Sequence, residues 1–512
     1  MLNEQASANN IKGVALSSSG PSIISLFYAD DLIITGQANL QEATNLITTL
    51  SSFLQISGQT PNWGKSSILF SSATSQEERN IVKGIFPVSD FSAATTYLGH
   101  PIFLAASTRS AAYFFLVDKF RGISSLRANK LSHAGRLTLI KSVFSSIPIY
   151  YMSHMLLSAK LIRKLTSIIR KFWWKGSLDN NSSDGICFRS WKDICRPKDE
   201  GGLGIRDLMM MNKSLVIHSA WNFLKNPNTL IAQVLKHKYF PHTSFWNCNK
   251  HTPKSAFWSS VLKLKPILHS SCIWQLSQGD ISIWNQPCCD IWEKIHEHNN
   301  TTALSLHLPS KVSELWTNQK SWNTPLISTY FHHQAVHSIC QVQVIPHLIP
   351  DNLCWKHTST GDCSTSSAYK EINRHSLLIP VTPEIRSLMN LIWKNKLIPP
   401  KIKVFTWRLL SKALPSGVNL NTRIPAISAH CSRCGQLENE GHIFFHCYFA
   451  RLTWLISPFH LNTSRLPPDA NPEHYICCLL STYNAKFTIQ RVLILLWQIW
   501  KARNDKLFRA KH

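Results

Sequence analysis

The stretch Ile23-Ile24-Ser25-Leu26-Phe27-Tyr28-Ala29-Asp30-Asp31-Leu32-Ile33-Ile34-Thr35 carries the sharpest pattern in the sequence. Two short apolar runs, Ile23–Tyr28 and Leu32–Thr35, flank two adjacent carboxylates. This pattern predicts a β-hairpin with Asp30 and Asp31 at its tip. Because neighbouring carboxylates repel each other and offer hard oxygen ligands, the pair is a candidate site for Mg²⁺. The alternative is an ordinary turn that contains two aspartates.

Helix and strand signals continue from the hairpin to about residue 105. Asn39 and Glu42 have capping-box spacing at the start of an apolar-faced helix that Gly58 and Pro61 end. A strand, Ser66–Phe70, and a short helix from Ser75 toward Phe86 are predicted to follow. We therefore expect an α+β domain at 1–105.

The rest of the chain is expected to be mostly helical and divided into several modules. Residues 106–178 show helical periodicity, and Asp179–Gly185 reads as a turn or linker. Residues 179–385 are rich in Trp, with weak periodicity. Helices are predicted after Pro399-Pro400 and near the C-terminus. The expected modules are 1–105, 106–178, 179–385, 386–460 and 461–512.

The charge of this 512-residue chain is strongly unbalanced. It holds 54 Lys and Arg against 28 Asp and Glu, a formal net charge of +26. No acidic residue lies between Asp118 and Asp179, a stretch that holds twelve Lys and Arg. A second acid-free stretch, residues 385–437, holds nine. Both stretches are also apolar enough to fold, so they predict basic surfaces for a polyanion such as nucleic acid; the alternative is ordinary solvated helix faces.

The sequence argues against a membrane or secreted protein. Its longest apolar run, Val492–Trp500, is far shorter than the roughly 18 residues of a membrane helix. The N-terminus has no basic-then-apolar signal, so an intracellular location, nucleus or cytoplasm, is expected. In such a compartment the 14 Cys indicate thiols or metal ligands and not a disulfide framework.

Cys431, Cys434, His442 and Cys447 have the spacing of a zinc site. Thiolate and imidazole are ligands that Zn²⁺ prefers, and four of them close a tetrahedral site. Gly435 permits the tight turn that follows the Cys-x2-Cys pair. His446 competes with Cys447 for the fourth position; we favour Cys447. The remaining alternative is a set of buried free cysteines.

Several further motifs, in order, complete a resemblance to one family. They are Ser57-Gly58-Gln59-Thr60-Pro61-Asn62 with Lys65-Ser66, Tyr97-Leu98-Gly99, Leu131-Ser132-His133-Ala134-Gly135-Arg136 with Leu139-Ile140-Lys141, and Glu200-Gly201-Gly202-Leu203-Gly204-Ile205-Arg206-Asp207-Leu208. With Tyr28-Ala29-Asp30-Asp31 they resemble the reverse transcriptase of plant non-LTR (LINE-type) retrotransposons. The region around Trp407-Arg408 and the Cys/His set resembles the zinc-binding domain that follows the polymerase in these elements.

The resemblance implies a fold and roles for named residues. The expected fold is α+β and multidomain: a partial palm, a helical thumb, a Trp-rich connection region and a small zinc-binding domain. Asp30 and Asp31 would bind Mg²⁺, and Lys65 would assist the chemistry. Contacts to RNA and DNA, the template–primer duplex, would come from Tyr97, Gly99, Arg136, Lys141, Lys401, Lys403 and Arg408.

One expected catalytic group is missing from this pattern. The family has a further aspartate N-terminal to the hairpin, whereas Glu4 is the only acidic residue before Asp30. The resemblance also implies fingers, an endonuclease and a ribonuclease H domain that the sequence lacks. We therefore expect an N-terminally truncated RNA-directed DNA polymerase that is inactive alone. The alternatives are a non-catalytic zinc-containing nucleic-acid-binding protein and a protein with an interaction role.

Overall fold

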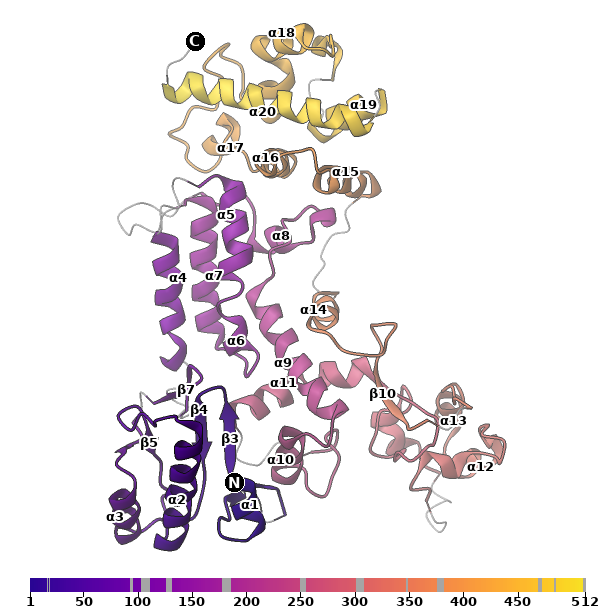
Figure 1. Cartoon of the computed structure of the whole chain (residues 1–512). Coiled ribbons are helices and arrows are strands. Elements are labelled where there is room, and N and C mark those ends of the chain that lie inside the picture. The colour runs from indigo at the N-terminus through magenta and orange to yellow at the C-terminus, as the bar shows by residue number, and fades with distance from the viewer. Residues whose placement is uncertain are drawn as a thin grey trace. The chain divides into compact units, whose positions relative to one another are not determined.

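The computed structural model describes residues 1–15, 17, 19–92, 95–102, 111–125, 131–176, 186–248, 255–300, 308–346, 349–374, 382–467, 472–482 and 485–509. These residues form two compact units (Figure 1). Unit 1 comprises Met1–Ala112, Ser153–Leu156 and Lys213–Glu371, and unit 2 comprises Tyr113–Met152, Leu157–Asn212 and Ile372–His512. The predicted linker at 179–185 lies outside the described residues.

Unit 1 combines short helices with two-stranded sheets. Its strands are β1 Val14–Ala15, β2 Ser22–Ile23, β3 Ser25–Tyr28, β4 Asp31–Ile34, β5 Ser67–Ile68, β6 Ser89–Asp90, β7 Thr96–Tyr97, β8 His100–Pro101, β9 Cys272–Gln275 and β10 Asn352–Trp355. Its helices are α1 Leu2–Ser7, α2 Leu40–Ser57, α3 Gln76–Ile85, α10 Leu230–Tyr239, α11 Ala256–Ser271, η5 Trp292–His298, η7 Val312–Leu315, α12 Thr324–Tyr330 and α13 His333–Cys340. Helices α9 Leu208–Lys225 and α14 Thr365–Arg374 each cross the boundary between the units.

The predicted carboxylate hairpin is confirmed. Strands β3 and β4 pair antiparallel, with Tyr28 opposite Asp31, so that Ala29 and Asp30 form a two-residue turn. Ala29 has a φ of 52°, a left-handed conformation that costs an L-residue about 1–2 kcal/mol. The turn leaves both aspartates exposed to solvent.

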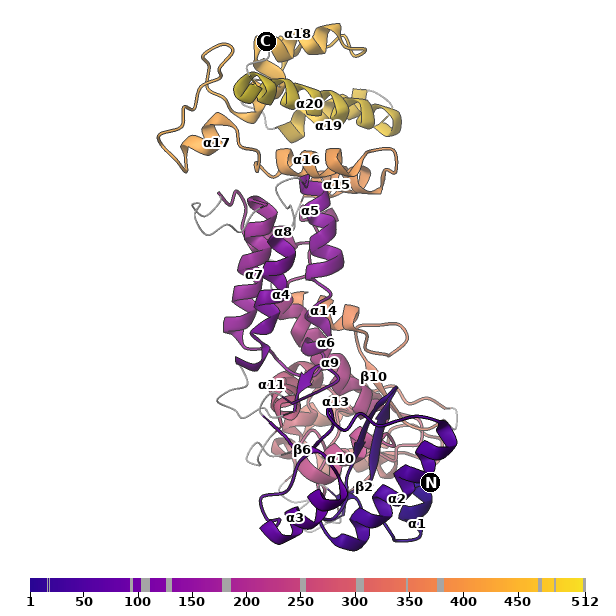
Figure 2. The same ribbon diagram turned by 60° about the vertical axis from the view of Figure 1, so that its left-hand side comes forward.

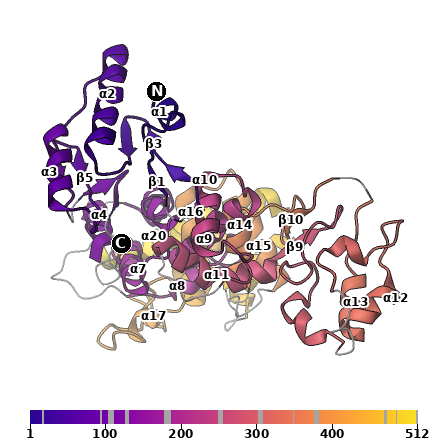
Figure 3. The ribbon, with the colours of Figure 1, turned by 90° about the horizontal axis from the view of Figure 1, so that it is seen from below.

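Helix α2 begins where the sequence predicts, but only half of the capping box forms. The Asn39 side chain accepts the N–H of Glu42 at 2.8 Å. The Glu42 carboxylate is buried and instead accepts the N–H of Lys12 at 2.9 Å, which ties the helix to the N-terminal segment. Gly58 ends the helix with a φ of 68°. Helix α3 packs beside α2 (Figure 3) and has a complete capping box from Ser75 and Glu78.

A single carboxylate organises the later part of unit 1. Asp351 accepts four consecutive backbone N–H groups, those of residues 277–280, at 2.7–3.0 Å. Gly279 in this loop has a φ of 70°, and a Cβ there would lie 2.7 Å from the Ser313 nitrogen. The contact fixes the ends of the β9–β10 pair, because strand β9 ends just before the loop and β10 begins just after Asp351.

The regular elements of the described part of unit 2 are helices, with one isolated antiparallel bridge between His430 and Leu437. Its elements are η1 Ala111–Tyr113 (which begins at the end of unit 1), α4 Phe115–Ser125, α5 His133–Leu139, the π-helical η3 Ile140–Phe144, α6 Ile149–Met152, α7 Ala159–Trp174, α8 Trp191–Cys195, η4 Lys198–Glu200, α15 Pro383–Lys394, α16 Pro400–Leu410, α17 Gly417–Asn421, the π-helical η8 His442–His446, α18 Tyr448–Ile456, η9 Thr463–Arg465, α19 Pro472–Thr482 and α20 Ala485–Arg509.

The core of unit 2 is an aromatic and aliphatic layer between its helices. Phe120, Phe144 and Phe172 are fully buried, and Phe144 lies 5.1 Å from each of the other two rings. Helix α7, beside α4 in Figure 2, turns an apolar face to this layer. Trp173 of α7 then meets Trp407 of α16 edge-on at 6.2 Å. The first acid-free stretch and the second therefore pack against each other within one unit.

The fold is mixed helical with small sheets and more than one compact unit. The units group the sequence differently from the predicted modules, because segments of 106–178 share a unit with segments of 386–460 and 461–512. The palm and thumb assignments stay predictions. Among the described helices, none combines the length and apolar character needed to cross a membrane.

We predict that Asp351→Asn lowers the free energy of unfolding of unit 1. The amide cannot accept the full set of N–H groups and carries no charge, and hydrogen bonds to charged groups contribute about 1.5–3 kcal/mol each. Urea denaturation should show a loss of about 2–3 kcal/mol.

The matched control is Asp280→Asn in the same loop. The Asp280 side chain forms an exposed ion pair with Lys311, which solvent screens, so its loss should change the free energy of unfolding little. Equal effects of the two substitutions would contradict the role assigned to Asp351.

Candidate metal centre

Two of the predicted zinc ligands lie on a tight turn between α17 and η8. The Gly435 N–H donates to the Cys431 carbonyl at 2.9 Å, and the Cys431 N–H donates to the Gln436 carbonyl at 2.7 Å. Gly435 adopts a φ of 75°, as its place after the Cys-x2-Cys pair predicts. The turn brings Cys431 and Cys434 to the same site.

The other two ligands are brought together by a π-helical turn. The Cys447 N–H donates to the His442 carbonyl at 2.7 Å, an i→i+5 bond that closes η8. The turn is anchored at its start, where the Asn439 side chain accepts the His442 N–H at 2.7 Å. Residues five apart thereby face the same point, which an α-helical turn would not achieve.

The four ligand atoms fit a tetrahedral zinc ion. The sulfurs of Cys431, Cys434 and Cys447 and a ring nitrogen of His442 all lie within 4.8 Å of one another. Zinc–ligand distances of about 2.0–2.3 Å place neighbouring ligand atoms roughly 3.5–3.8 Å apart. Burial raises the pKa of the Cys447 thiol to about 12 and also raises that of Cys431. A bound cation is therefore what would hold these sulfurs as thiolates.

His446, the alternative fourth ligand, contacts Tyr475 and not the other three ligands. Its Nε2 lies 2.9 Å from the Tyr475 hydroxyl, and its ring packs against that of Tyr475. It is absent from the group of converging ligand atoms. The geometry therefore favours Cys447, as the sequence spacing did.

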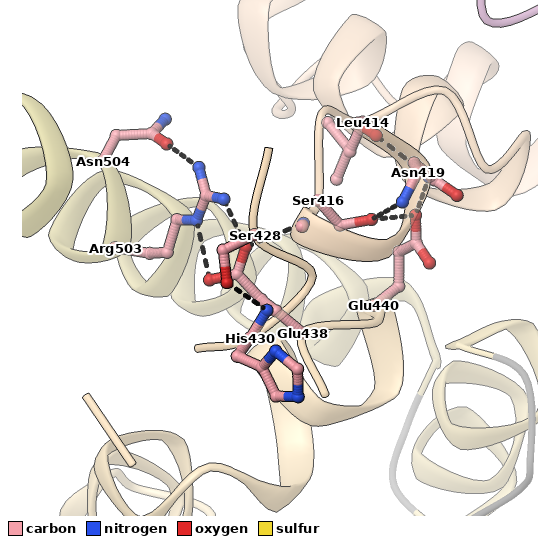
Figure 4. Close-up of polar contacts among 10 residues, drawn as sticks. Leu414, Ser416, Asn419, Ser428, His430, Glu438, Glu440, Arg503 and Asn504 are labelled. Atoms are coloured by element: carbon pink, nitrogen blue, oxygen red, sulfur yellow. Dashed lines mark hydrogen bonds and ion pairs between the residues drawn. The ribbon is translucent and has the colours of Figure 1, made fainter. Parts of the chain in front are cut away.

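A buried ion pair joins the metal-binding segment to the C-terminal helix (Figure 4). Arg503 of α20 donates to both carboxylate oxygens of Glu438, one contact measuring 3.2 Å. Glu438 also accepts the Gly417 N–H at 2.9 Å. The side chains are only 2% and 10% exposed for Glu438 and Arg503, so this pair is shielded from water and salt.

Two neighbouring contacts reinforce this connection. Arg433, between the first two cysteines, donates to the Ala502 carbonyl at 3.0 Å and lies 4.3 Å above the Phe449 ring. Glu440 accepts the Asn419 side-chain amide at 2.5 Å and the Ser416 hydroxyl at 3.3 Å (Figure 4). The metal-binding segment is thus held from both sides, by α17 and by α20.

The predicted magnesium and primer residues lie in unit 1. Asp30 and Asp31 stand exposed at the hairpin tip, and Lys65 is exposed on a turn closed by Asn62. No ion pair joins these three described side chains. Tyr97 and Gly99 belong to the β7–β8 hairpin, whose turn residues Leu98 and Gly99 have φ values of 50° and 74°. Their functional roles stay predictions.

Two of the predicted nucleic-acid contacts point into unit 2. Arg136 is 8% exposed and donates to the Trp173 carbonyl at 3.3 Å. Lys141 is half-buried and donates to the Leu203 carbonyl at 2.6 Å. In this conformation both cations bind the protein's own backbone.

The three contacts predicted in α16 differ in access to solvent. Arg408 is half-buried, donates to the Ala413 carbonyl at 3.2 Å, and has its pKa lowered to about 10 by burial. Lys403 donates to the Trp393 carbonyl at 2.9 Å. Lys401 is exposed and lies 4.7 Å from the Trp497 ring centroid. Of the three, Lys401 is the most accessible to a partner.

Sequence reasoning missed the residues that support the metal-binding segment. Glu438, Glu440 and Arg503 were not candidates, although both glutamates lie between the second cysteine and the histidine. Two acids that directly follow a 53-residue acid-free stretch were an available signal. No sequence signal pointed to its partner Arg503, because that residue lies 65 positions from Glu438.

We predict that the purified chain holds about one zinc ion and that Cys447→Ser and Cys434→Ser each lose it, because three donors leave the tetrahedral site open. His446→Gln should keep the metal. Zinc per chain is measured by mass spectrometry after exhaustive buffer exchange. Retention by Cys447→Ser together with loss by His446→Gln would transfer the fourth position to the histidine.

We also predict that Arg503→Met destabilises unit 2 by about 3–5 kcal/mol, because Glu438 is left as an unpaired buried carboxylate. Urea denaturation measures this change. The control is Arg509→Met in the same helix, whose exposed side chain pairs with the half-buried Asp505 and should contribute about 0–1 kcal/mol. A loss no greater than that of the control would show that the buried pair does not hold α20.

The chain is similar to one protein family and to two proteins of Arabidopsis thaliana. Residues 363–454 match the family described as zinc-binding in reverse transcriptase. A protein of Arabidopsis thaliana named "Putative ribonuclease H protein" is 28% identical over 336 residues, which cover 64% of this chain and 52% of that protein. The chain thus spans about half the length of this relative.

A second relative is shorter. An uncharacterized mitochondrial protein of Arabidopsis thaliana is 34% identical over 135 residues, which cover 26% of this chain and 86% of that protein. The match to the zinc-binding family coincides with the segment that carries the Cys/His site. The chain therefore belongs to the family of this mitochondrial relative and is a reverse-transcriptase-related protein of retrotransposon origin with a reverse-transcriptase zinc-binding domain.

Proposed function

We propose that this chain is part of a plant LINE-type reverse transcriptase and that it grips the template–primer duplex of RNA and DNA. In this proposal residues 1–105 are the C-terminal half of the palm, 106–178 the thumb and 179–385 the connection region. The zinc-binding domain and the C-terminal helix would add further contacts to the duplex. The relatives, the zinc site and the net charge of +26 all support this assignment.

The observation that carries the proposal is the two-faced character of α7. One face is apolar and buried in the unit 2 core. The opposite face exposes Lys160, Arg163 and Lys164, and the helix itself contains no carboxylate. A row of exposed cations along one helix face suits a regularly spaced row of phosphates. This surface is more accessible than Arg136 or Lys141.

The zinc ion would have a structural role. When bound by its three thiolates and one imidazole, it would order the segment between α17 and α18. Through Glu438 and Arg433 that segment holds α20 in place, and Lys401 of α16 and Lys501 of α20 flank Trp497 at 4.7 and 5.0 Å. The metal would thereby organise a second basic surface.

For the chemistry, Asp30 and Asp31 would bind Mg²⁺, with Lys65 and the Tyr97–Gly99 turn near the reacting end of the primer. A two-metal polymerase centre uses a further carboxylate from a neighbouring strand. Among the described residues, only the Cys/His group brings three or more ligand atoms together. We therefore propose that the isolated chain binds template–primer without extending it. The second candidate, a non-catalytic zinc-containing nucleic-acid-binding protein, shares the binding surfaces and is favoured by the same observation.

Binding of a labelled RNA–DNA template–primer tests the proposal. The affinity should fall steeply between 50 and 200 mM salt, because phosphate contacts release counterions. Replacing Lys160, Arg163 and Lys164 by Gln should weaken binding and reduce the slope of log K against log salt by roughly 2–3, about 0.9 per lost contact. The control triple variant replaces Lys236, Lys238 and Lys263, exposed lysines of α10 and α11, by Gln.

The same samples are assayed for primer extension with Mg²⁺ or Mn²⁺. Extension that Asp30→Ala/Asp31→Ala abolishes would show that the chain completes a catalytic centre, against our proposal. Absence of salt-sensitive binding at 50 mM salt would leave only a role in protein interaction.

A further inference from the structure

Lysines from three separate elements of unit 2 converge on one glycine-rich loop. Lys141 comes from η3, Lys403 from α16, and Lys198 from the loop itself, residues 196–207. We name Lys141, Lys198 and Lys403 the loop lysine cluster. The resemblance assigned Lys141 and Lys403 to nucleic-acid contact one by one, but it assigned no role to Lys198 and did not bring the three together.

Several contacts fix the positions of the three ammonium groups. The Lys141 Nζ donates to the Leu203 carbonyl at 2.6 Å, and the Lys403 Nζ donates to the Trp393 carbonyl at 2.9 Å. The Lys198 Nζ lies 4.5 Å above the Trp393 ring. The loop itself is held by α16, whose Trp407 Nε1 donates to the Gly201 carbonyl at 2.8 Å.

Lys141 and Lys198 both lie close to Gly204. A Cβ built on this glycine, whose φ is 62°, would lie 3.5 Å from the Lys141 Nζ and 3.6 Å from the Lys198 Cγ. Each ammonium has three donors, and the hydrogen bonds to Leu203 and Trp393 engage one donor of Lys141 and one of Lys403. Lys198 is exposed, and so is Arg206 at the end of the loop.

The positive charges repel one another. Burial, followed by the charges of Lys198 and Arg206, lowers the pKa of Lys141 to about 8. Burial and then Lys198 lower the pKa of Lys403. An anion placed among these groups would relieve the repulsion that they impose on one another.

The acids of the same loop are not arranged to neutralise the cluster. Glu200 faces Arg386 of α15 at 4.0 Å, and Asp207 accepts the N–H groups of Met209 and Met210 at the start of α9. Asp199 forms no ion pair with the three lysines, and among the described residues no other carboxylate does. No described carboxylate of unit 2 therefore forms a direct ion pair with the cluster.

We propose that the loop lysine cluster, with Arg206 at its rim, is a binding site for a backbone phosphate of a nucleic acid. Lysine ammonium groups bind phosphate as point charges, and several of them close to one loop suit the single negative charge of a backbone phosphodiester. The inference rests on the proposed function and deepens it, since it places a phosphate contact where the two acid-free stretches meet.

The test uses the full chain loaded with zinc and the variant Lys198→Gln/Arg206→Gln. Both side chains are exposed, so the hydrogen bonds of Lys141 and Lys403 stay intact, and melting temperature and zinc content check the fold. The control is Lys236→Gln/Lys238→Gln on α10, which removes the same charge from exposed positions. Binding of a labelled RNA–DNA duplex is measured between 50 and 200 mM salt.

The expected result is a weakening of about tenfold or more at 100 mM salt and a salt slope smaller by roughly 2. The control should stay within about twofold of the unsubstituted chain. A cluster variant that matches the control overturns this inference, while the α7 variant still tests the proposed function. Equal loss of binding to polyglutamate would assign the cluster to an acidic protein partner, and no duplex binding by the unsubstituted chain would overturn both ideas.

Discussion

Cations without nearby carboxylates are the constraint on which unit 2 depends. In the two acid-free stretches, three buried or half-buried cations donate to backbone carbonyls of other elements. Arg136 binds the end of α7, Lys141 binds the glycine-rich loop, and Lys403 binds the end of α15. Each contact joins two different elements. The hydrogen bond that satisfies the cation therefore also holds the two elements together. The cations on the opposite surfaces remain in solvent.

The metal centre follows a different principle, because there the charges are paired. A Cys-x2-Cys turn and a π-turn supply the ligands, while Glu438 and Arg503 form a buried ion pair beside them. A zinc site is short-range, and by itself would order only the segment between its ligands. The ion pair extends that order to the C-terminal helix. This explains why a domain matched only to residue 454 packs against residues beyond 500.

Much of the local structure could be predicted because its causes lie close together in the sequence. The hairpin at Asp30-Asp31, the Ser75–Glu78 capping box and the end of α2 at Gly58 all depend on residues within nine positions of one another. The zinc ligands also lie within one short segment. Where a long-range contact intervened, prediction failed: Glu42 binds Lys12 instead of completing its capping box.

By itself the sequence determined the local elements, the ligand set of the metal site and the excess of positive charge, because spacing and composition fix these directly. Only the tertiary structure decided which cations face solvent and which are used inside. Helical periodicity does not reveal that Arg136 meets Trp173 or that Lys141 meets Leu203, since those carbonyls are 37 and 62 residues away. It also decided that the two acid-free stretches pack in one unit, because the Trp173–Trp407 contact spans a sequence distance over which spacing carries no information.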